Sequence, residues 1–316
     1  MPWSGPARDI IRSSLKDGDG GGSAAAIWDL VAELASTGAD RRRRAIERIQ
    51  EHGRTDLAPF LLNLLKSVDA GVRRDTAETL GLIGYEIVAD CGEVLAGLLY
   101  DVVPEVREEA VVAIWRLGFA GAVPELQKLM CFDASAAVRL AVARVLTGFD
   151  EGSSSGWVRA KPPRTQSLPL SATEAGNGVY FEHALADPDA AVRAHAAVGL
   201  GLSRSVDSNV RLDRLIETES DPLARAGLLC GAWLLGGGSQ VLEEFLRMAH
   251  DRAIAAEMCH WIHLYLDRKP ASEEARRDVA RIRTALRGWP EAAELIRRIA
   301  LWQGEQLLAK ARAAEL

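Results

Sequence analysis

The stretch VRRDTAETLGLIG, residues 72–84, recurs along the chain and decides the fold. Similar thirteen-residue segments start at residues 106, 138, 192 and 224, and a weaker copy starts at residue 41. Successive starts are 31, 34, 32, 54 and 32 residues apart. Small or apolar residues occupy the first, the fifth or sixth, and the ninth positions of each copy, as Val72, Ala77 and Leu80 do in the first clear one. This spacing indicates one face of an α-helix and not an alternating strand.

Each copy is followed by a second segment with helical periodicity. These second segments include residues 56–65, 87–100, 122–130, 211–218 and 241–249, and the second segment of the copy at 138 resumes around Val179. The repeating unit is therefore helix, turn, helix in about 32 residues. One such pair cannot bury its own apolar faces, whereas stacked pairs can. The sequence therefore predicts an all-α fold, an α-solenoid or superhelix of stacked helix pairs with helical caps.

The segment DPDAAVR at residues 187–193, followed by an alanine-rich helix, resembles a HEAT repeat. The closest resemblance is to the short HEAT-like subtype named after the phycobilin lyases, and it covers roughly residues 38–250. It implies an array of HEAT-like helix pairs. It does not imply an activity, because such folds carry unrelated functions.

An acidic turn precedes the clear copies, and an arginine follows at the second position of each copy. We expect the aspartates to accept N–H groups of the first helical turn. In the HEAT family the acidic turn and the arginine bridge neighbouring repeats, so the resemblance implies a structural ladder. A phosphate-binding stripe of arginines is the alternative. The candidate ladder residues are Asp69, Arg73, Asp101, Arg107, Asp133, Arg139, Asp189, Arg193, Asp221 and Arg225.

The ends of the chain depart from the repeat. Residues 1–23 are polar and glycine-rich and are predicted to be a flexible N-terminal segment. The repeat array is expected over residues 24–250 and opens with a capping helix. Residues 251–316 are expected to form a C-terminal helical cap that continues the array, because a solenoid needs terminal units with a polar outer face.

An irregular insertion, residues 150–178, accounts for the anomalous 54-residue interval. The repeat phase places it between the first and second helices of one unit. Tryptophan and arginine are frequent interface anchors, so the insertion is predicted to bind a partner. The alternative is a tolerated insertion without a function. The candidate partner-binding residues are Trp157, Arg159, Lys161 and Arg164.

Composition limits the classes of partner. The net charge of -6 makes attraction to nucleic acid or to an anionic membrane surface unfavourable and favours a basic protein partner. No apolar stretch has the roughly 20 residues that a spanning helix needs. Four widely spaced cysteines indicate reduced thiols, and the N-terminus has no apolar signal core. These features predict a cytoplasmic protein.

Glu257, His260 and His263 are the strongest candidates for metal ligands. Their three-residue spacing puts them near one helix face. A dinuclear carboxylate site needs a matching E-x-x-H from a facing helix, and the sequence has no second copy. We therefore interpret these residues as half-buried polar side chains and predict no metal and no cofactor.

Two functions remain open. The first is a non-catalytic protein-interaction scaffold that binds a partner on its concave surface, on the insertion, or on both. An inhibitor or immunity-type protein is one concrete form. The alternative is an enzyme on a HEAT-like scaffold, either a chromophore lyase or a DNA base-removing enzyme. No catalytic residues are predicted for either enzyme.

Overall fold

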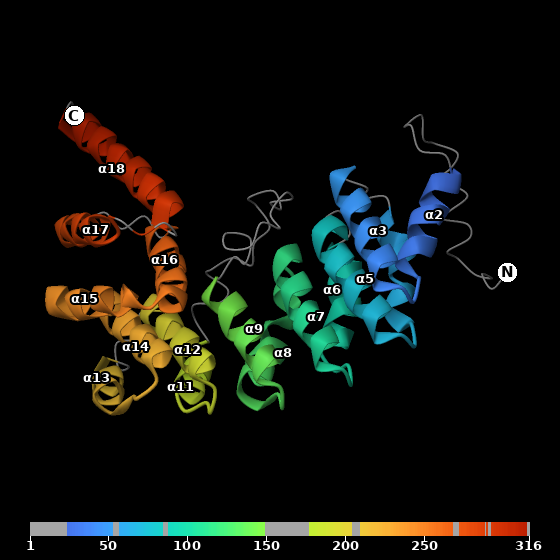
Figure 1. Cartoon of the computed structure of the whole chain (residues 1–316), viewed down its shortest axis with the longest axis horizontal. Helices are drawn as coiled ribbons and strands as arrows, with labels where there is room; N and C mark the ends of the chain where they lie inside the picture. Colours follow the sequence, from blue (N-terminus) through green and yellow to red (C-terminus); the bar gives the residue numbers. More distant parts are fainter. Residues whose placement is uncertain are drawn as a thin grey trace. The chain divides into compact units, whose positions relative to one another are not determined.

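A computed structural model of the protein describes residues 24–52, 57–84, 88–148, 177–203, 209–267, 272–287, 289 and 292–314. All regular structure in these ranges is helical, and no described residue lies in a strand (Figure 1). The predicted all-α fold of stacked helix pairs is confirmed for these residues. By their contacts the described residues form two compact units, divided between Leu126 and Gln127.

Unit 1 contains the beginning of the array. It opens with α2 (Ala24–Leu34), which packs on the first helix of the weaker copy. Its first helices are α3 (Ala39–Glu51), α5 (Ala70–Ile83) and α7 (Pro104–Leu117). Its second helices are α4 (Ala58–Leu61) with the 3-10 helix η2 (Leu64–Lys66), and α6 (Val88–Leu98). The first helices pack in chain order, α3 on α5 and α5 on α7. The 3-10 helix η4 (Ala120–Ala122) leads into α8 (Val123–Phe132), in which the division between the units falls.

Unit 2 continues the repeat and adds the C-terminal helices. Its first helices are α9 (Ala136–Thr147), α12 (Ala190–Ser203) and α14 (Pro222–Leu234). Its second helices are α11 (Gly178–Ala184), α13 (Asn209–Thr218) and α15 (Gly238–Arg247), the last followed by η7 (Met248–His250). The chain ends with α16 (Arg252–Asp267), α17 (Glu273–Ala285) and α18 (Ala293–Ala314). Helix α9 packs directly on α12 although the insertion separates them in the sequence.

Neighbouring first helices approach closely where both carry small residues. A Cβ atom added at Gly81 of α5 would lie 2.8 Å from the Cα atom of Ala113 on α7. One added at Gly201 of α12 would lie 2.7 Å from the carbonyl oxygen of Gly231 on α14. Real Cβ atoms do not come this close to backbone, so glycine is required at these contacts. The tenth position of these two copies is therefore a helix-to-helix contact.

The core of unit 2 extends from the repeat into the C-terminal helices through aromatic side chains. Trp233 of α14 lies 4.6 Å, between ring centroids, from Tyr265 of α16 and stacks on Phe245 of α15. Its indole Nε1 donates a hydrogen bond of 2.9 Å to Asp278 of α17, and both side chains are buried. Trp261 of α16 has no exposed surface in this core. Helices α16 and α17 are thus fixed against the last repeat, which consists of α14 and α15.

Candidate functional site

An arginine near the start of a first helix joins its own turn to the next repeat. Arg139 Nη1 donates to the carbonyl oxygen of Asp133, at 2.8 Å, in the turn before its helix. Its Nε and Nη2 donate to the two carboxylate oxygens of Asp187, at 2.7 and 2.9 Å, across the repeat boundary. The same geometry joins Arg73 to Asp101. The hydrogen bond that Arg73 donates lowers the pKa of Asp101, although partial burial of the carboxyl group opposes this shift. The guanidinium N–H groups of Arg73 and Arg139 that could bind a phosphate are therefore already hydrogen-bonded within the protein.

The acidic residues of the turns occupy two positions with different partners. The residue two places before the helix N-cap reaches the neighbouring repeat. The N-cap residue itself folds back on its own helix and accepts N–H groups of the first turn. The first position holds Asp101, Asp187 and Glu219, and the second holds Asp69, Asp189 and Asp221.

Three further arginines of the ladder make the following contacts. Arg193 pairs with Glu219, at 2.8 and 3.0 Å, and not with Asp221. Arg225 reaches Glu244 on α15, at 2.7 Å. Arg107 donates to the carbonyl oxygen of Asp101 in its own turn, at 2.8 Å.

A second polar cluster joins α9, α12 and α16 inside unit 2. Arg144 Nη2 donates to Glu257 Oε1 at 2.9 Å, and His195 Nε2 lies 3.4 Å from Glu257 Oε2. His195 is 1% exposed and meets the ring of Trp261 edge-on. His260, one turn after Glu257 on α16, is also buried. The cluster thus connects residues separated by 113 positions in the chain.

The charge states of this cluster suit a structural contact better than proton transfer. Burial opposes ionisation of Glu257, but His195 and Arg144 outweigh it and lower its pKa to about 2. Burial lowers the pKa of His195, and it lowers the pKa of His260 to about 3 and that of His263 to about 4. At pH 7 the carboxylate is therefore ionised and the imidazoles are neutral. A general base works best with a pKa near the operating pH.

The metal candidates of the sequence, Glu257, His260 and His263, lie along α16. Within the part of the chain that the structure describes, no group of three or more His, Cys, Asp or Glu side chains is placed to hold a metal ion. Glu257 instead accepts a hydrogen bond from Arg144.

The neutral His260 predicts acid sensitivity. Its folded pKa, about 3, lies below the ordinary value of 6.5, so the unfolded chain binds the proton more tightly. Its contribution to stability is therefore complete above pH 6.5 and is lost as the pH falls from 6.5 toward 3. We expect about 1–3 kcal/mol of unfolding free energy to be lost between pH 7 and 4 from this residue. Urea denaturation as a function of pH measures it.

The substitution His260→Gln should flatten this pH dependence, whatever it does to the stability at pH 7. The same substitution at the exposed His250 is the control. An unchanged slope in His260→Gln between pH 6.5 and 4 contradicts the assignment.

A strip of exposed apolar side chains lies on the second helices of unit 2. Phe132, the last residue of α8, is 74% exposed, and Val179 of α11 is 75% exposed. The rings of Phe132 and His183 are 5.4 Å apart, and His183 follows Val179 by one turn of α11. Gln127 holds the two helices together by donating to Asn177 at 2.7 Å. We call Phe132, Val179 and His183 the aromatic strip.

The aromatic strip is not predicted by the repeat pattern, because the apolar periodicity of the second segment ends at Met130. The alignment of the repeats nevertheless contains a signal for this exposed surface. Tyr100 of unit 1 occupies the same repeat position, directly before the acidic turn, and is 71% exposed. Val102 and Val68, in the turns of unit 1, are also exposed. An aromatic residue before the turn therefore marks a surface position in both units.

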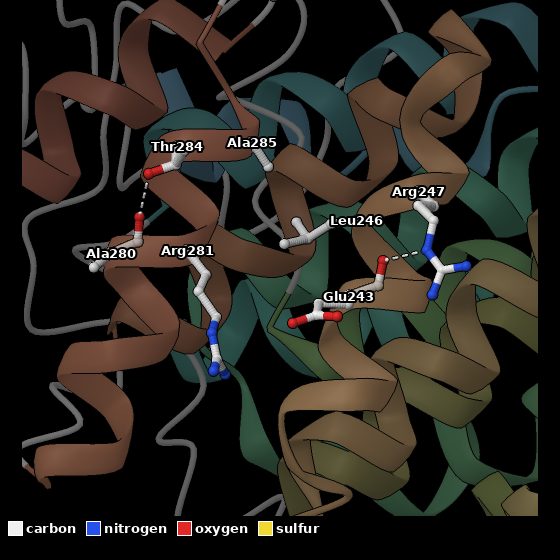
Figure 2. Close-up of a pocket in the computed structure, with 7 residues that line it drawn as sticks. All are labelled: Glu243, Leu246, Arg247, Ala280, Arg281, Thr284 and Ala285. Carbon is white, nitrogen blue, oxygen red and sulfur yellow. Dashed lines mark hydrogen bonds between the residues drawn. The ribbon is translucent and has the colours of Figure 1, made fainter.

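A groove of about 560 Å³ lies between α15 and α17 of unit 2 (Figure 2). Its apolar floor comes from Leu246 of α15 and from Ala280 and Ala285 of α17. Its polar lining residues are Glu243, Arg247, Arg281 and Thr284. The Thr284 hydroxyl donates to the carbonyl oxygen of Ala280 at 3.0 Å, so it is satisfied within its own helix.

The predicted partner-binding residues of the insertion, Trp157, Arg159, Lys161 and Arg164, lie outside the described residues. The structure resumes next to the insertion at Asn177, and α11 begins at Gly178, one residue before the predicted start of the second helix. The described surfaces on either side of the insertion are therefore the end of α9 and the start of α11.

Comparison with known proteins gives structural likeness only. No protein-family model matches the sequence, and no curated protein matches it. An engineered protein is 19% identical with a TM-score of 0.41, covering 74% of this chain and 98% of that one. The Escherichia coli protein YibA is 16% identical with a TM-score of 0.36, covering 84% and 98%. Human deoxyhypusine hydroxylase, solved in complex with glycerol, is 16% identical with a TM-score of 0.33, covering 76% and 96%.

A helix that crosses a bilayer must be both long and apolar. Across the described ranges, no helix combines the length and the apolar character that crossing a membrane requires.

Proposed function

We propose that the chain is a cytoplasmic, non-catalytic scaffold that binds a protein partner. The aromatic strip of Phe132, Val179 and His183 is the observation that best supports this. An aromatic side chain that is 74% exposed contributes little to the core of its own unit. Burying a side chain of this size against a partner contributes about 1.5–3 kcal/mol. Contiguous exposed apolar residues of this kind are typical of protein-binding surfaces.

The partner is proposed to be a basic protein. The chain carries a net charge of -6, which favours encounter with a protein of opposite charge. An inhibitor or immunity-type protein that caps a basic toxin or enzyme is one concrete form. The insertion residues Trp157, Arg159, Lys161 and Arg164 are proposed as a second contact with the same partner.

The substitution Phe132→Asp tests the aromatic strip. We expect the tagged full-length protein to recover a stoichiometric partner from an extract of its native host, and Phe132→Asp to reduce that recovery about tenfold, the equivalent of about 1.4 kcal/mol. The melting temperature should stay unchanged, because the replaced side chain points into solvent. Leu301→Asp on α18, where the leucine is 66% exposed, is the matched control.

Two results count against the scaffold. One is an extract that yields no stoichiometric partner, and the other is equal recovery by Phe132→Asp and the native protein. The enzyme alternative, with the phycobilin-lyase-type subtype as its lyase form, is tested on the same protein by bilin transfer and by release of alkylated bases. Activity above background in either assay overturns the non-catalytic proposal.

A further inference from the structure

The groove between α15 and α17 is shaped to hold a segment of chain. Its volume of about 560 Å³ has room for several side chains. Ala280 and Ala285 leave space beside Leu246 because their side chains end at Cβ. Figure 2 shows Leu246 between the two helices, with Arg281 and Arg247 on opposite sides of it. Sites for small molecules enclose most of the ligand surface, whereas grooves between helices accept an amphipathic helix along their length.

The groove is rimmed by positive charge from both helices. Arg247 of α15 and Arg281 of α17 line it, and Arg277 lies one turn before Arg281 on the same face of α17. All three side chains are exposed. Glu243 is the acidic residue of the lining, and in Figure 2 its carboxylate and the Arg247 guanidinium point away from each other. The rim is therefore locally cationic in a chain whose net charge is -6.

The rim arginines make weak contacts within the protein. Arg247 Nε donates to the carbonyl oxygen of Glu243 at 3.3 Å, a long hydrogen bond. Arg281 Nη1 lies 3.5 Å from an oxygen of Asp278, and the other oxygen of that carboxylate accepts the hydrogen bond from Trp233. Exposed ion pairs of this length contribute little. Both guanidinium groups therefore keep donors in directions that face solvent.

We propose that this groove binds an acidic amphipathic helix, a local acidic segment of a partner protein whose net charge is basic. Apolar side chains of that helix pack on Leu246, Ala280 and Ala285, and its carboxylates accept paired hydrogen bonds from Arg247 and Arg281. A basic helix is repelled by the same guanidinium groups. A small anion would pair with the guanidinium groups but would leave the apolar floor of the groove exposed to water. The inference rests on the proposed protein-binding function and names the chemistry of one partner segment.

A labelled synthetic peptide tests the groove on the full-length protein. The probe is an amphipathic helix of leucine and glutamate, compared with the same peptide in which lysine replaces glutamate, and with inorganic phosphate as competitor. We expect the glutamate peptide to bind and its affinity to fall with added salt. The pair Arg247→Glu and Arg281→Glu should weaken binding about tenfold or more. Arg44→Glu, at an exposed arginine of α3 in unit 1, should leave binding unchanged.

Three results overturn the proposal. They are equal binding of the two peptides, unchanged binding by the Arg247→Glu, Arg281→Glu protein, and complete displacement of the peptide by phosphate, which would indicate a simple anion site. Failure here is distinguishable from failure of the scaffold function. If the native partner is still recovered and is lost in Phe132→Asp, the scaffold stands and only the groove assignment falls.

Discussion

Gly231→Ala is expected to destabilise unit 2 by about 2–4 kcal/mol, which is large for the addition of one methyl group. Gly231 of α14 faces Ala197 of α12, and an added Cβ would overlap the carbonyl oxygen and carbon of Ala197. Backbone atoms of a helix cannot move aside without moving the whole helix. The contact between α12 and α14 would therefore open along its length. Urea or thermal denaturation monitored by circular dichroism measures the loss.

At Gly304, replacement of glycine by alanine is expected to increase stability instead of decreasing it. This glycine lies in the interior of α18, and an added Cβ would meet no atom within 4 Å. Gly304→Ala should raise stability by roughly 0.5–1 kcal/mol, because alanine loses less backbone entropy than glycine in a helix. Equal effects of the two substitutions would show that helix propensity, and not the approach of α12 and α14, governs Gly231.

The periodicity predicted these contacts only in part. It identified the ninth position of each copy as small or apolar, whereas the helix-to-helix contacts at Gly81 and Gly201 lie at the tenth position, one residue later. It predicted the second helices and the start of α11 after the insertion because apolar spacing is a local property of the sequence. The period does not reveal which helices come closest, because that depends on the side chains of both partners together.

Contacts outside the repeat were beyond sequence reasoning. Trp233 is an example. It lies in the aromatic core with α15 and α16 and donates to Asp278 of α17. The pairing of Arg144 with Glu257 depends on α16 packing beside α9 and α12, and no repeat signal extends to α16. The sequence indicated that the polar residues of α16 are half-buried, but it could not indicate that Glu257 pairs with Arg144.

Arg139→Ala is expected to cost about 3–5 kcal/mol, the range for a buried ion pair that loses one member. The side chains of Arg139 and Asp187 are 10% and 6% exposed, so the substitution leaves a carboxylate that water cannot solvate. It also removes the donor to the carbonyl oxygen of Asp133. Arg139→Lys should recover only part of the loss, because an ammonium group cannot reproduce the paired geometry of the guanidinium. Denaturant midpoints of the three proteins measure the series.

Arg225→Ala is the control at the other end of the same ladder. The side chains of Arg225 and Glu244 are 33% and 39% exposed, so this pair should contribute only about 0.2–1 kcal/mol. Combining Arg139→Ala with Asp187→Asn should restore much of the loss, since the buried charge is removed together with its partner. If Arg139→Ala costs no more than Arg225→Ala, burial does not set the strength of the ladder. The bridge between Arg139 and Asp187 would then not be a main source of stability at this repeat boundary.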